Sequence, residues 1–166
     1  MKLARLGLAL AAVLAFAGAA TAQEGTLDKI RQPGAITIGH RDASIPFSYY
    51  DDRQQPVGYA IDLCLRIVEA IKNELRLPKL DVKYQLVTSA NRIPLMANGT
   101  IDLECGSTTN NLERQKQVWF TITHFVTANR WVSKKSSNLN VLADLKGKTV
   151  VSTAGTTNIK QITELN

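Results

Sequence analysis

The hydrophobic pattern of the chain alternates between short apolar runs and one long segment with helical spacing. Between residues 60 and 77 apolar side chains recur on one face of a helix, and Pro78 ends this segment. Strands separated by helices are therefore predicted. The short apolar runs, which are typical of buried strands, occupy residues 35–39, 82–87, 101–103, 125–132 and 148–152.

Turn and capping residues predict the remaining elements. Phe47–Tyr50 and Val57–Tyr59 flank a polar turn and predict a hairpin. Ser89 is expected to cap a helix that ends at Asn98-Gly99. The sequence from Asn110 to Glu113 resembles a capping box, with Asn in place of Ser or Thr. Further helical segments are expected at 26–31, at 141–145 and from 157 onward.

Strands that alternate with helices indicate an α/β domain with a largely parallel sheet. In such sheets ligands bind beyond the carboxyl ends of the strands. We therefore expect the ligand site to be built from the polar clusters at these ends, with His40 as a structural residue. The clusters are His40-Arg41, Ser89 to Arg92, Gly106 to Arg114 and Ala154 to Thr157.

The stretch from Glu104 to Arg114 carries the most specific chemistry in the chain. A predicted strand leads into small, hydroxyl-bearing residues, and a helix-prone run that contains Arg114 follows. Free backbone N–H groups and a helix N-terminus favour negative charge. An arginine can hold a carboxylate or a phosphate with two parallel hydrogen bonds. This layout predicts an anion-binding cradle, with carboxylate and phosphate both open as ligands.

Residues 1–22 predict a cleaved secretory signal peptide. Lys2 and Arg5 supply a positive n-region, residues 6–20 form an apolar and glycine run, and Ala20-Thr21-Ala22 is a small-x-small cleavage site. A membrane anchor is the weaker alternative, because about 20 apolar residues are needed to span a bilayer. We expect a soluble protein outside the cytoplasm.

The net charge of the chain limits the classes of partner that it is expected to bind. Two of the 20 basic side chains lie in the signal segment, and the others still outnumber the 14 acidic side chains. The basic residues form no stripe, and export also argues against nucleic acid as a partner. The excess indicates attraction for anionic small molecules or ordinary surface charge.

The two cysteines, Cys64 and Cys105, leave the redox state open. An exported protein permits a disulfide. Because Cys64 lies on an apolar helix face and Cys105 at a strand end, we expect two buried free thiols in preference to a bridge. Together with His40 and His124 they do not form a zinc-ligand pattern. No metal and no cofactor are expected.

Several stretches resemble the periplasmic solute-binding proteins of amino-acid ABC transporters, family 3, and most of all the glutamate/aspartate-binding members. The resemblance implies a type II periplasmic binding fold, in which two α/β lobes close on the ligand. The resembling stretches are GTLDKI, GHRDASIPFSYYDD, VGYAIDLC, TSANRIPLMANGTIDLECGSTTNNLERQKQ and ADLKGKTVVSTAGTT.

The same resemblance implies a division of the chain. Residues 23–129 would form lobe one, residues 130–140 the hinge crossover and linker, and residues 141–166 the start of lobe two. Members of the family continue for about a hundred further residues, a figure in line with ordinary domain size. We therefore expect the sequence to be C-terminally truncated, with the partner of the ligand ammonium group beyond Asn166.

The resemblance also assigns site residues. Arg114 would bind the α-carboxylate of the ligand, helped by Ser107 and Thr109. Thr156 and Thr157 would donate from lobe two, at a helix N-terminus. For Arg114 the alternative is a surface helix arginine, and for the two threonines it is a plain helix cap.

Arg41 and Arg92 are expected to give the site its preference for acidic ligands. In the wider family the position of Arg92 is usually apolar, and a buried carboxylate needs a charged partner. The alternative for both arginines is a solvated loop charge. Ser89 could either bind the ligand or cap its helix.

The leading hypothesis is periplasmic binding of glutamate or aspartate for delivery to an ABC transporter permease in the inner membrane, by a monomer. Another polar amino acid is an alternative ligand, and a ligand-sensing domain or a periplasmic dehydratase would be alternatives on the same scaffold. We do not expect an enzyme, because arginines and hydroxyl groups bind ligands but do not readily exchange protons at neutral pH.

Overall fold

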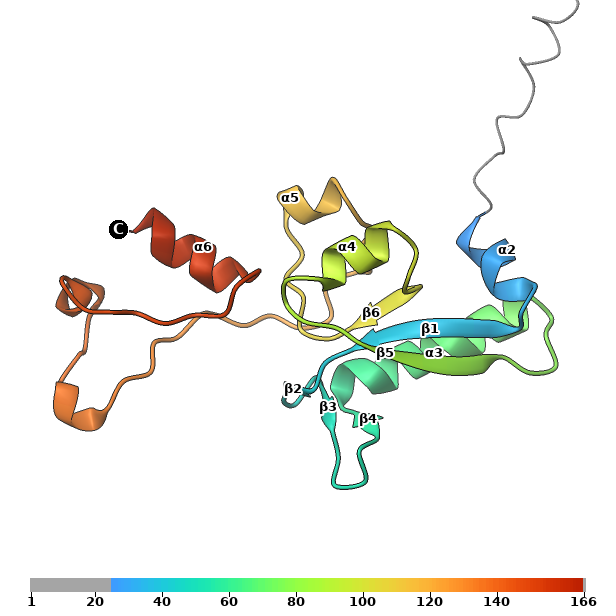
Figure 1. Ribbon diagram of the computed structural model, residues 1–166, viewed down its shortest axis with the longest axis horizontal. Helices are drawn as coiled ribbons and strands as arrows, with labels where there is room; N and C mark the ends of the chain where they lie inside the picture. Colours follow the sequence, from blue (N-terminus) through green and yellow to red (C-terminus); the bar gives the residue numbers. More distant parts are fainter. Residues whose placement is uncertain (1–24, 166) are drawn as a thin grey trace, which may run out of the picture.

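A three-stranded parallel sheet forms the centre of the molecule (Figure 1). The computed structural model describes residues 25–165; the predicted signal peptide, 1–22, lies outside the described residues. Strand β1 (Ala35–His40) lies between β5 (Asp81–Leu86) and β6 (Leu103–Cys105). In the register of the sheet, His40 pairs with both Leu86 and Cys105. The carboxyl ends of all three strands therefore meet at one edge, as the alternation of strands and helices predicted.

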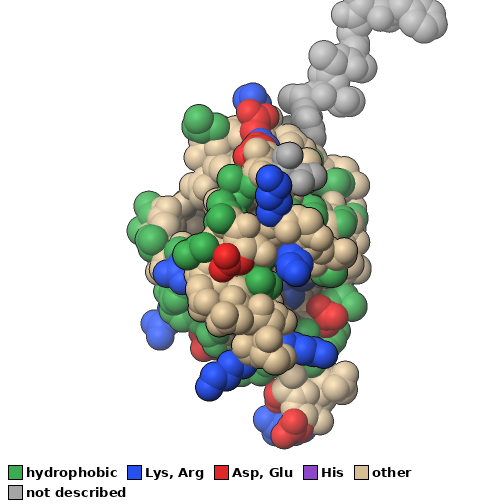
Figure 2. Space-filling model, turned by 90° about the vertical axis from the view of Figure 1, so that its left-hand side faces the viewer, with side chains coloured by type: hydrophobic (Ala, Val, Ile, Leu, Met, Phe, Trp, Pro, Cys, Tyr) green, Lys and Arg blue, Asp and Glu red, His purple; other side chains and the backbone are tan. Residues whose placement is uncertain are grey.

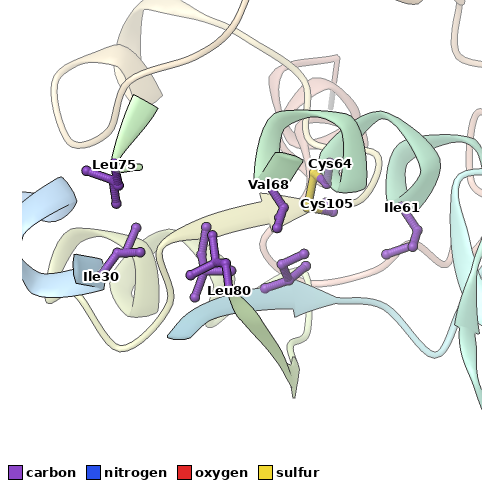
Figure 3. Packing of buried hydrophobic residues seen from close by; sticks show 9 residues of the cluster. Ile30, Ile61, Cys64, Val68, Leu75, Leu80 and Cys105 are labelled. Atoms are coloured by element: carbon purple, nitrogen blue, oxygen red, sulfur yellow. A yellow bond between two sulfur atoms is a disulfide. The ribbon is translucent and has the colours of Figure 1, made fainter. Parts of the chain in front are cut away.

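Helix α3 (Tyr59–Glu74) lies along one face of this sheet and supplies three of the nine buried residues of the core cluster (Figure 3). Its buried residues Ile61, Cys64 and Val68 recur at helical spacing and pack toward β1. β1 is apolar and buried along most of its length, as expected for a central parallel strand. Ile36 and Ile38 of β1 are completely inaccessible to solvent.

Two short helices flank the sheet. Helix α2 (Thr26–Arg31) precedes β1, and α4 (Arg92–Ala97) packs against β6. A buried carboxylate fastens α2 to the sheet: Asp102 accepts hydrogen bonds from Lys29 Nζ at 2.7 Å and from the Thr37 backbone N–H at 2.8 Å. Such charge-assisted bonds hold the start of β1 in register with the residue before β6.

In the sequence, a small antiparallel sheet lies between β1 and α3. It contains β2 (Ala43–Ser44), β3 (Ser48–Tyr50) and β4 (Pro56–Val57), so the predicted hairpin is confirmed. Gly58 connects it to α3 with a φ of 126°, and a Cβ there would lie 2.6 Å from the Phe47 carbonyl oxygen. Only glycine fits this junction, because both the positive φ and the close approach exclude a side chain.

The predictions for the loops beyond β5 and β6 were partly wrong. Ser89 does not cap α4, because the preceding turn is closed by Thr88 and Asn91, which exchange backbone-to-side-chain hydrogen bonds. The capping box predicted from Asn110 to Glu113 is not formed: the cap of α5 (Leu112–Gln115) is Asn111, whose side chain accepts from the Arg114 backbone N–H, and Glu113 pairs with Lys116. The cap of α4 was assigned to the wrong residue because several neighbouring hydroxyl and amide side chains can each form hydrogen bonds with the backbone at this turn.

The chain after α5 is mostly irregular. It contains the 3-10 turns η1 (Lys135–Ser137) and η2 (Leu142–Leu145) and the helix α6 (Thr157–Glu164). The strands predicted at 125–132 and 148–152 are wrong, since no described strand pairs with either segment and a strand exists only through such pairing. Val126 and Val132 are accordingly exposed. Within residues 25–165 we find no helix with the length and apolarity to span a bilayer.

The prediction of two free thiols was wrong, because Cys64 and Cys105 form a disulfide that joins α3 to the last residue of β6 (Figure 3). Their Cα atoms lie 6.3 Å apart although 41 positions separate them in the sequence. α3 crosses the sheet so that its apolar face meets the end of β6, and this approach is not visible in either local sequence pattern. Both cysteines are nevertheless buried, as expected.

Removal of the disulfide is expected to lower the free energy of unfolding by about 4 kcal/mol, because the closed loop restricts the unfolded chain. Urea unfolding with and without reductant measures the effect. The double substitution Cys64→Ser and Cys105→Ser should unfold at one midpoint under both conditions, since the sequence has 2 cysteines in total. A wild-type midpoint that reductant leaves unchanged would contradict the prediction.

Candidate functional site

The carboxyl edge of the parallel sheet carries a cluster of three arginines and one glutamate. Arg41 directly follows β1, Glu104 is the middle residue of β6, and Arg92 is the first residue of α4. The fourth member, Arg114, lies on α5. All three arginines interact electrostatically with Glu104. The sheet register therefore brings together side chains that lie far apart in the sequence.

Glu104 has its carboxyl group inside this cluster. Thr108 donates a hydrogen bond from Oγ1 to Oε2 of Glu104 at 2.7 Å, whereas Oε1 is buried without a hydrogen-bond partner among the described residues. A Cβ at Gly106 would lie 2.5 Å from Oε1 and 3.1 Å from Cγ of Arg41. Glycine at position 106 thus allows the strand end to pass close to both side chains.

Burial and charge act in opposite directions on the ionisation of this cluster. Burial raises the pKa of Glu104, while the Thr108 hydroxyl and the three guanidinium groups oppose the rise. Burial lowers the pKa of Arg92, Glu104 raises it, and the neighbouring Arg114 and Arg41 lower it further. The pKa of Arg114 is lowered by burial, against the influence of Glu104. The site contains more positive charge than its one carboxylate can balance.

Arg41 and Arg92 retain hydrogen-bonding capacity. In the part of the chain that the structure describes, the Nε atoms of both residues are buried and lack a partner. Arg92 is 3% exposed, so water does not readily replace the missing acceptor. Unpaired buried donors are unfavourable, and a bound anion would satisfy them. This arrangement can bind carboxylate groups.

Arg114 connects the loop between β6 and α5, residues 106–111 (the cradle loop), to the start of α6. It donates from Nη1 to the Thr109 carbonyl at 2.8 Å and from Nη2 to the Gly155 carbonyl at 3.2 Å. Gly155 has a φ of 74°, and a Cβ there would lie 2.6 Å from both the Ser89 carbonyl oxygen and the Ala90 Cα. The loop before α6 therefore touches two of the loops at the carboxyl edge of the sheet.

The hydroxyl residues predicted for the site lie around the same edge. Ser107 is exposed, and its Oγ lies 2.7 Å from Oγ of Ser44 on β2. Ser89 is buried next to Gly155. Thr156 caps α6 by accepting from the Ile159 backbone N–H, and Thr157 is the first residue of that helix. The cap of α6, which was the alternative role for Thr156, is present.

The structure brings the predicted residues together, but not in a single cavity. A hollow of about 300 Å³ is lined by residues 106–110, by residues 120–127 and by Phe47. It includes Ser107 and Thr109 but none of the three arginines. Arg92 is buried, and Arg41 and Arg114 are partly exposed. We place the candidate site at the arginine cluster, because charge and unpaired donors occur there.

The positively charged side chains on one face of the surface are scattered, whereas the three arginines of the cluster converge. Figure 2 views the molecule from the side on which α6 lies in Figure 1, and Lys and Arg side chains are scattered over this face. They do not gather there into one stripe. Among the described residues, no group of three or more His, Cys, Asp or Glu side chains could hold a metal ion.

The sequence pattern gave Glu104 no role. A charged residue directly after the predicted strand 101–103, two positions before Gly106, is the signal that could have identified it. His40 is buried as expected, and Tyr50 and Tyr84 contact its ring. Its Nε2 lies 3.3 Å from the Tyr50 hydroxyl, which confirms a structural position at the end of β1.

The fold is that of the type II periplasmic amino-acid-binding proteins. The chain aligns with the solved structure of the solute receptor for L-cysteine of Neisseria gonorrhoeae with a TM-score of 0.69 at 24% identity. The alignment covers 84% of this chain and 55% of that structure. Residues 36–164 match the bacterial extracellular solute-binding proteins, family 3, and the chain belongs to this family.

Two curated relatives are much more similar in sequence. The chain is 57% identical over 143 residues to the L-glutamate/L-aspartate-binding protein of Pseudomonas aeruginosa, which covers 86% of the chain and 47% of the relative. It is 53% identical over 162 residues to the glutamate/aspartate import solute-binding protein of Escherichia coli, with coverages of 97% and 54%. The chain thus spans about half the length of these relatives.

The raised pKa of Glu104 predicts a pH-dependent contribution to stability. The unfolded carboxyl has its ordinary pKa near 4.5, and the folded pKa is higher. The wild type should therefore gain most, relative to Glu104→Gln, below the unfolded pKa and lose this gain as the pH rises through the folded pKa. Gln keeps the acceptor for Thr108 but does not ionise.

Urea unfolding of both proteins over a series of pH values measures this difference. The exposed Glu113, which pairs with Lys116 at 2.9 Å, provides a matched control. The difference between wild type and Glu113→Gln should show much less dependence on pH. A Glu104 difference that grows in favour of the wild type with rising pH would contradict the prediction.

Proposed function

We propose that the chain belongs to a periplasmic protein that binds acidic amino acids, glutamate or aspartate, for an ABC importer. The observation that carries this proposal is the convergence of Arg41, Arg92 and Arg114 at the carboxyl edge of the sheet, where two buried Nε donors lack a partner in the described part of the chain. The 57% and 53% identity to glutamate/aspartate-binding relatives supports the same ligand class.

The two carboxylates of the ligand have different partners in this proposal. Arg114 binds the α-carboxylate, and the hydroxyl groups of Ser107 and Thr109 add hydrogen bonds. Arg41 and Arg92 bind the side-chain carboxylate. A neutral side chain would leave these two guanidinium groups without a counter-charge, which is unfavourable in a buried site. Selectivity for acidic ligands therefore depends on Arg41 and Arg92.

The loop before α6 completes the site from the other side. Thr156 and Thr157 lie at the N-terminus of α6, where backbone N–H groups and the helix dipole favour an anion. Ser89 binds the ligand beside them. In the division proposed here, residues 23–129 form lobe one, residues 130–140 the hinge crossover and linker, and 141–166 the start of lobe two. Closure of the two lobes excludes water from the ligand.

Binding without catalysis is the activity that this set of groups supports. Guanidinium groups do not exchange protons at neutral pH, and among the described residues the hydroxyl groups of Ser107 and Thr156 contact a serine hydroxyl and a backbone carbonyl, neither of which is a general base. The protein would work as a monomer in the periplasm after removal of residues 1–22. It would deliver the amino acid to a permease in the inner membrane.

Isothermal titration of the full-length protein with glutamate, aspartate, glutamine and histidine tests this function. Clear binding of histidine or glutamine without binding of either acidic amino acid would exclude it. Within this experiment, Arg92→Met is expected to weaken glutamate binding by about tenfold or more, while glutamine affinity changes by less than about threefold. Met preserves the aliphatic part of the buried side chain and removes its charge.

Arg53→Met is the control for a simple loss of positive charge. Arg53 lies in the hairpin turn, its side chain is 88% exposed, and it pairs with Asp51. This variant should bind all ligands as the wild type does. An equal loss of glutamate and glutamine affinity in Arg92→Met would show that Arg92 maintains the fold and does not select the ligand.

Gly155→Ala is expected to weaken glutamate binding by about tenfold, because the added Cβ would meet the backbone at Ser89 and Ala90 and move α6 away from the site. Gly147→Ala is the matched control. Gly147 also has a positive φ, 72°, but a Cβ there meets nothing within 4 Å. Titration of both variants separates loss of contact from backbone strain. Equal affinities would contradict this role of Gly155.

A further inference from the structure

Glu104 is the acidic member of a site that the proposed function assigns to an anionic ligand. Its side chain comes from β6, and its Oε1 atom is buried without a hydrogen-bond partner among the described residues. The other oxygen accepts from Thr108. No described arginine forms an ion pair with it within 4.0 Å, although all three interact with it electrostatically. Glu104 is thus a nearby charge and not a tightly bound partner of one arginine.

The groups that face Glu104 come from every element around it. Arg41 follows β1, Arg92 begins α4, Arg114 lies on α5, and the uncharged Thr108 lies in the cradle loop. His40 is the last residue of β1 and directly precedes Arg41; its ring contacts Tyr50 and Tyr84. The ionisation of Glu104 therefore depends on three guanidinium groups, on its burial and on whatever anion these groups bind.

The ionisation state of Glu104 changes the net charge of the cluster and therefore its attraction for an anionic ligand. With Glu104 ionised, three guanidinium groups face one carboxylate of the protein. With Glu104 protonated, the full positive charge is available to the ligand. A second ligand carboxylate placed among the same arginines is repelled by ionised Glu104, and this repulsion is strong in a site with low water content.

We propose that Glu104 is a specificity-determining residue of this site: its carboxyl group sets how much positive charge the arginine cluster offers, and hence how strongly a ligand with two carboxylates is preferred to one with a single carboxylate. This inference rests on the proposed function. It also implies that an acidic ligand binds together with a proton, which is taken up by Glu104 when the ligand carboxylates become the counter-ions of the arginines.

The test compares full-length wild type and Glu104→Gln by isothermal titration with L-glutamate and L-glutamine. Titrations run between about pH 5.5 and pH 8, where the ligand carboxylates stay ionised. At the upper end, Glu104→Gln should bind glutamate about tenfold more tightly than the wild type, with less than about threefold change for glutamine. Wild-type glutamate affinity should weaken as the pH rises, and that of Glu104→Gln should stay constant.

Two further variants and one further measurement sharpen the result. Glu104→Asp keeps the charge and should keep the pH dependence, whereas Glu113→Gln removes an exposed charge and should behave as the wild type. Titration in buffers of different ionisation enthalpy should show proton uptake with glutamate in the wild type and none in Glu104→Gln.

The outcomes distinguish this inference from the proposed function. Equal loss of both ligands in Glu104→Gln would show a structural role, and equal glutamate affinity of the two proteins at every pH would show that Glu104 carries no weight. Either result overturns the inference while wild-type glutamate binding stands. A wild type that binds no acidic amino acid overturns the proposed function, and the inference with it.

Discussion

The pairing of β1 with both of its neighbours is the constraint on which the site depends. Because β5 and β6 run parallel to β1 in a fixed register, the residues that follow each strand reach the same edge of the sheet. Burial of β1 beneath α3 keeps this register, since a shift by one residue would turn its isoleucines toward solvent. The positions of Arg41 and Glu104 are consequences of this pairing.

The cluster at this edge works against stability. Three guanidinium groups converge beside one carboxyl group, and two of their Nε donors are buried without partners among residues 25–165. Buried, incompletely paired charges are usually unfavourable for folding and are typical of functional sites. The disulfide at Cys105, one residue beyond Glu104, holds the strand end on α3. Apolar packing and the disulfide thus offset the unfavourable free energy of the charged cluster at this edge.

The sequence was sufficient where one strong local signal decided the structure. The spacing of Ile61, Cys64 and Val68 predicted α3, and the strand ends predicted the edge where Arg41 and Arg92 lie. It was insufficient where the outcome depended on distant segments. The apolar run at 125–132 has strand composition but no described strand beside it. The disulfide and the burial of Glu104 likewise arise from contacts across the fold.

The contact of Gly155 with Ser89 and Ala90 separates two properties that evolution can change independently. This contact is made by main-chain atoms, so it depends on the path of the backbone and on the absence of a side chain at one position. In the function proposed above, ligand choice depends instead on the side chains at the edge of the sheet. On that proposal, exchange of these side chains would redirect the scaffold to new solutes, while the main-chain contact at Gly155 stays the same.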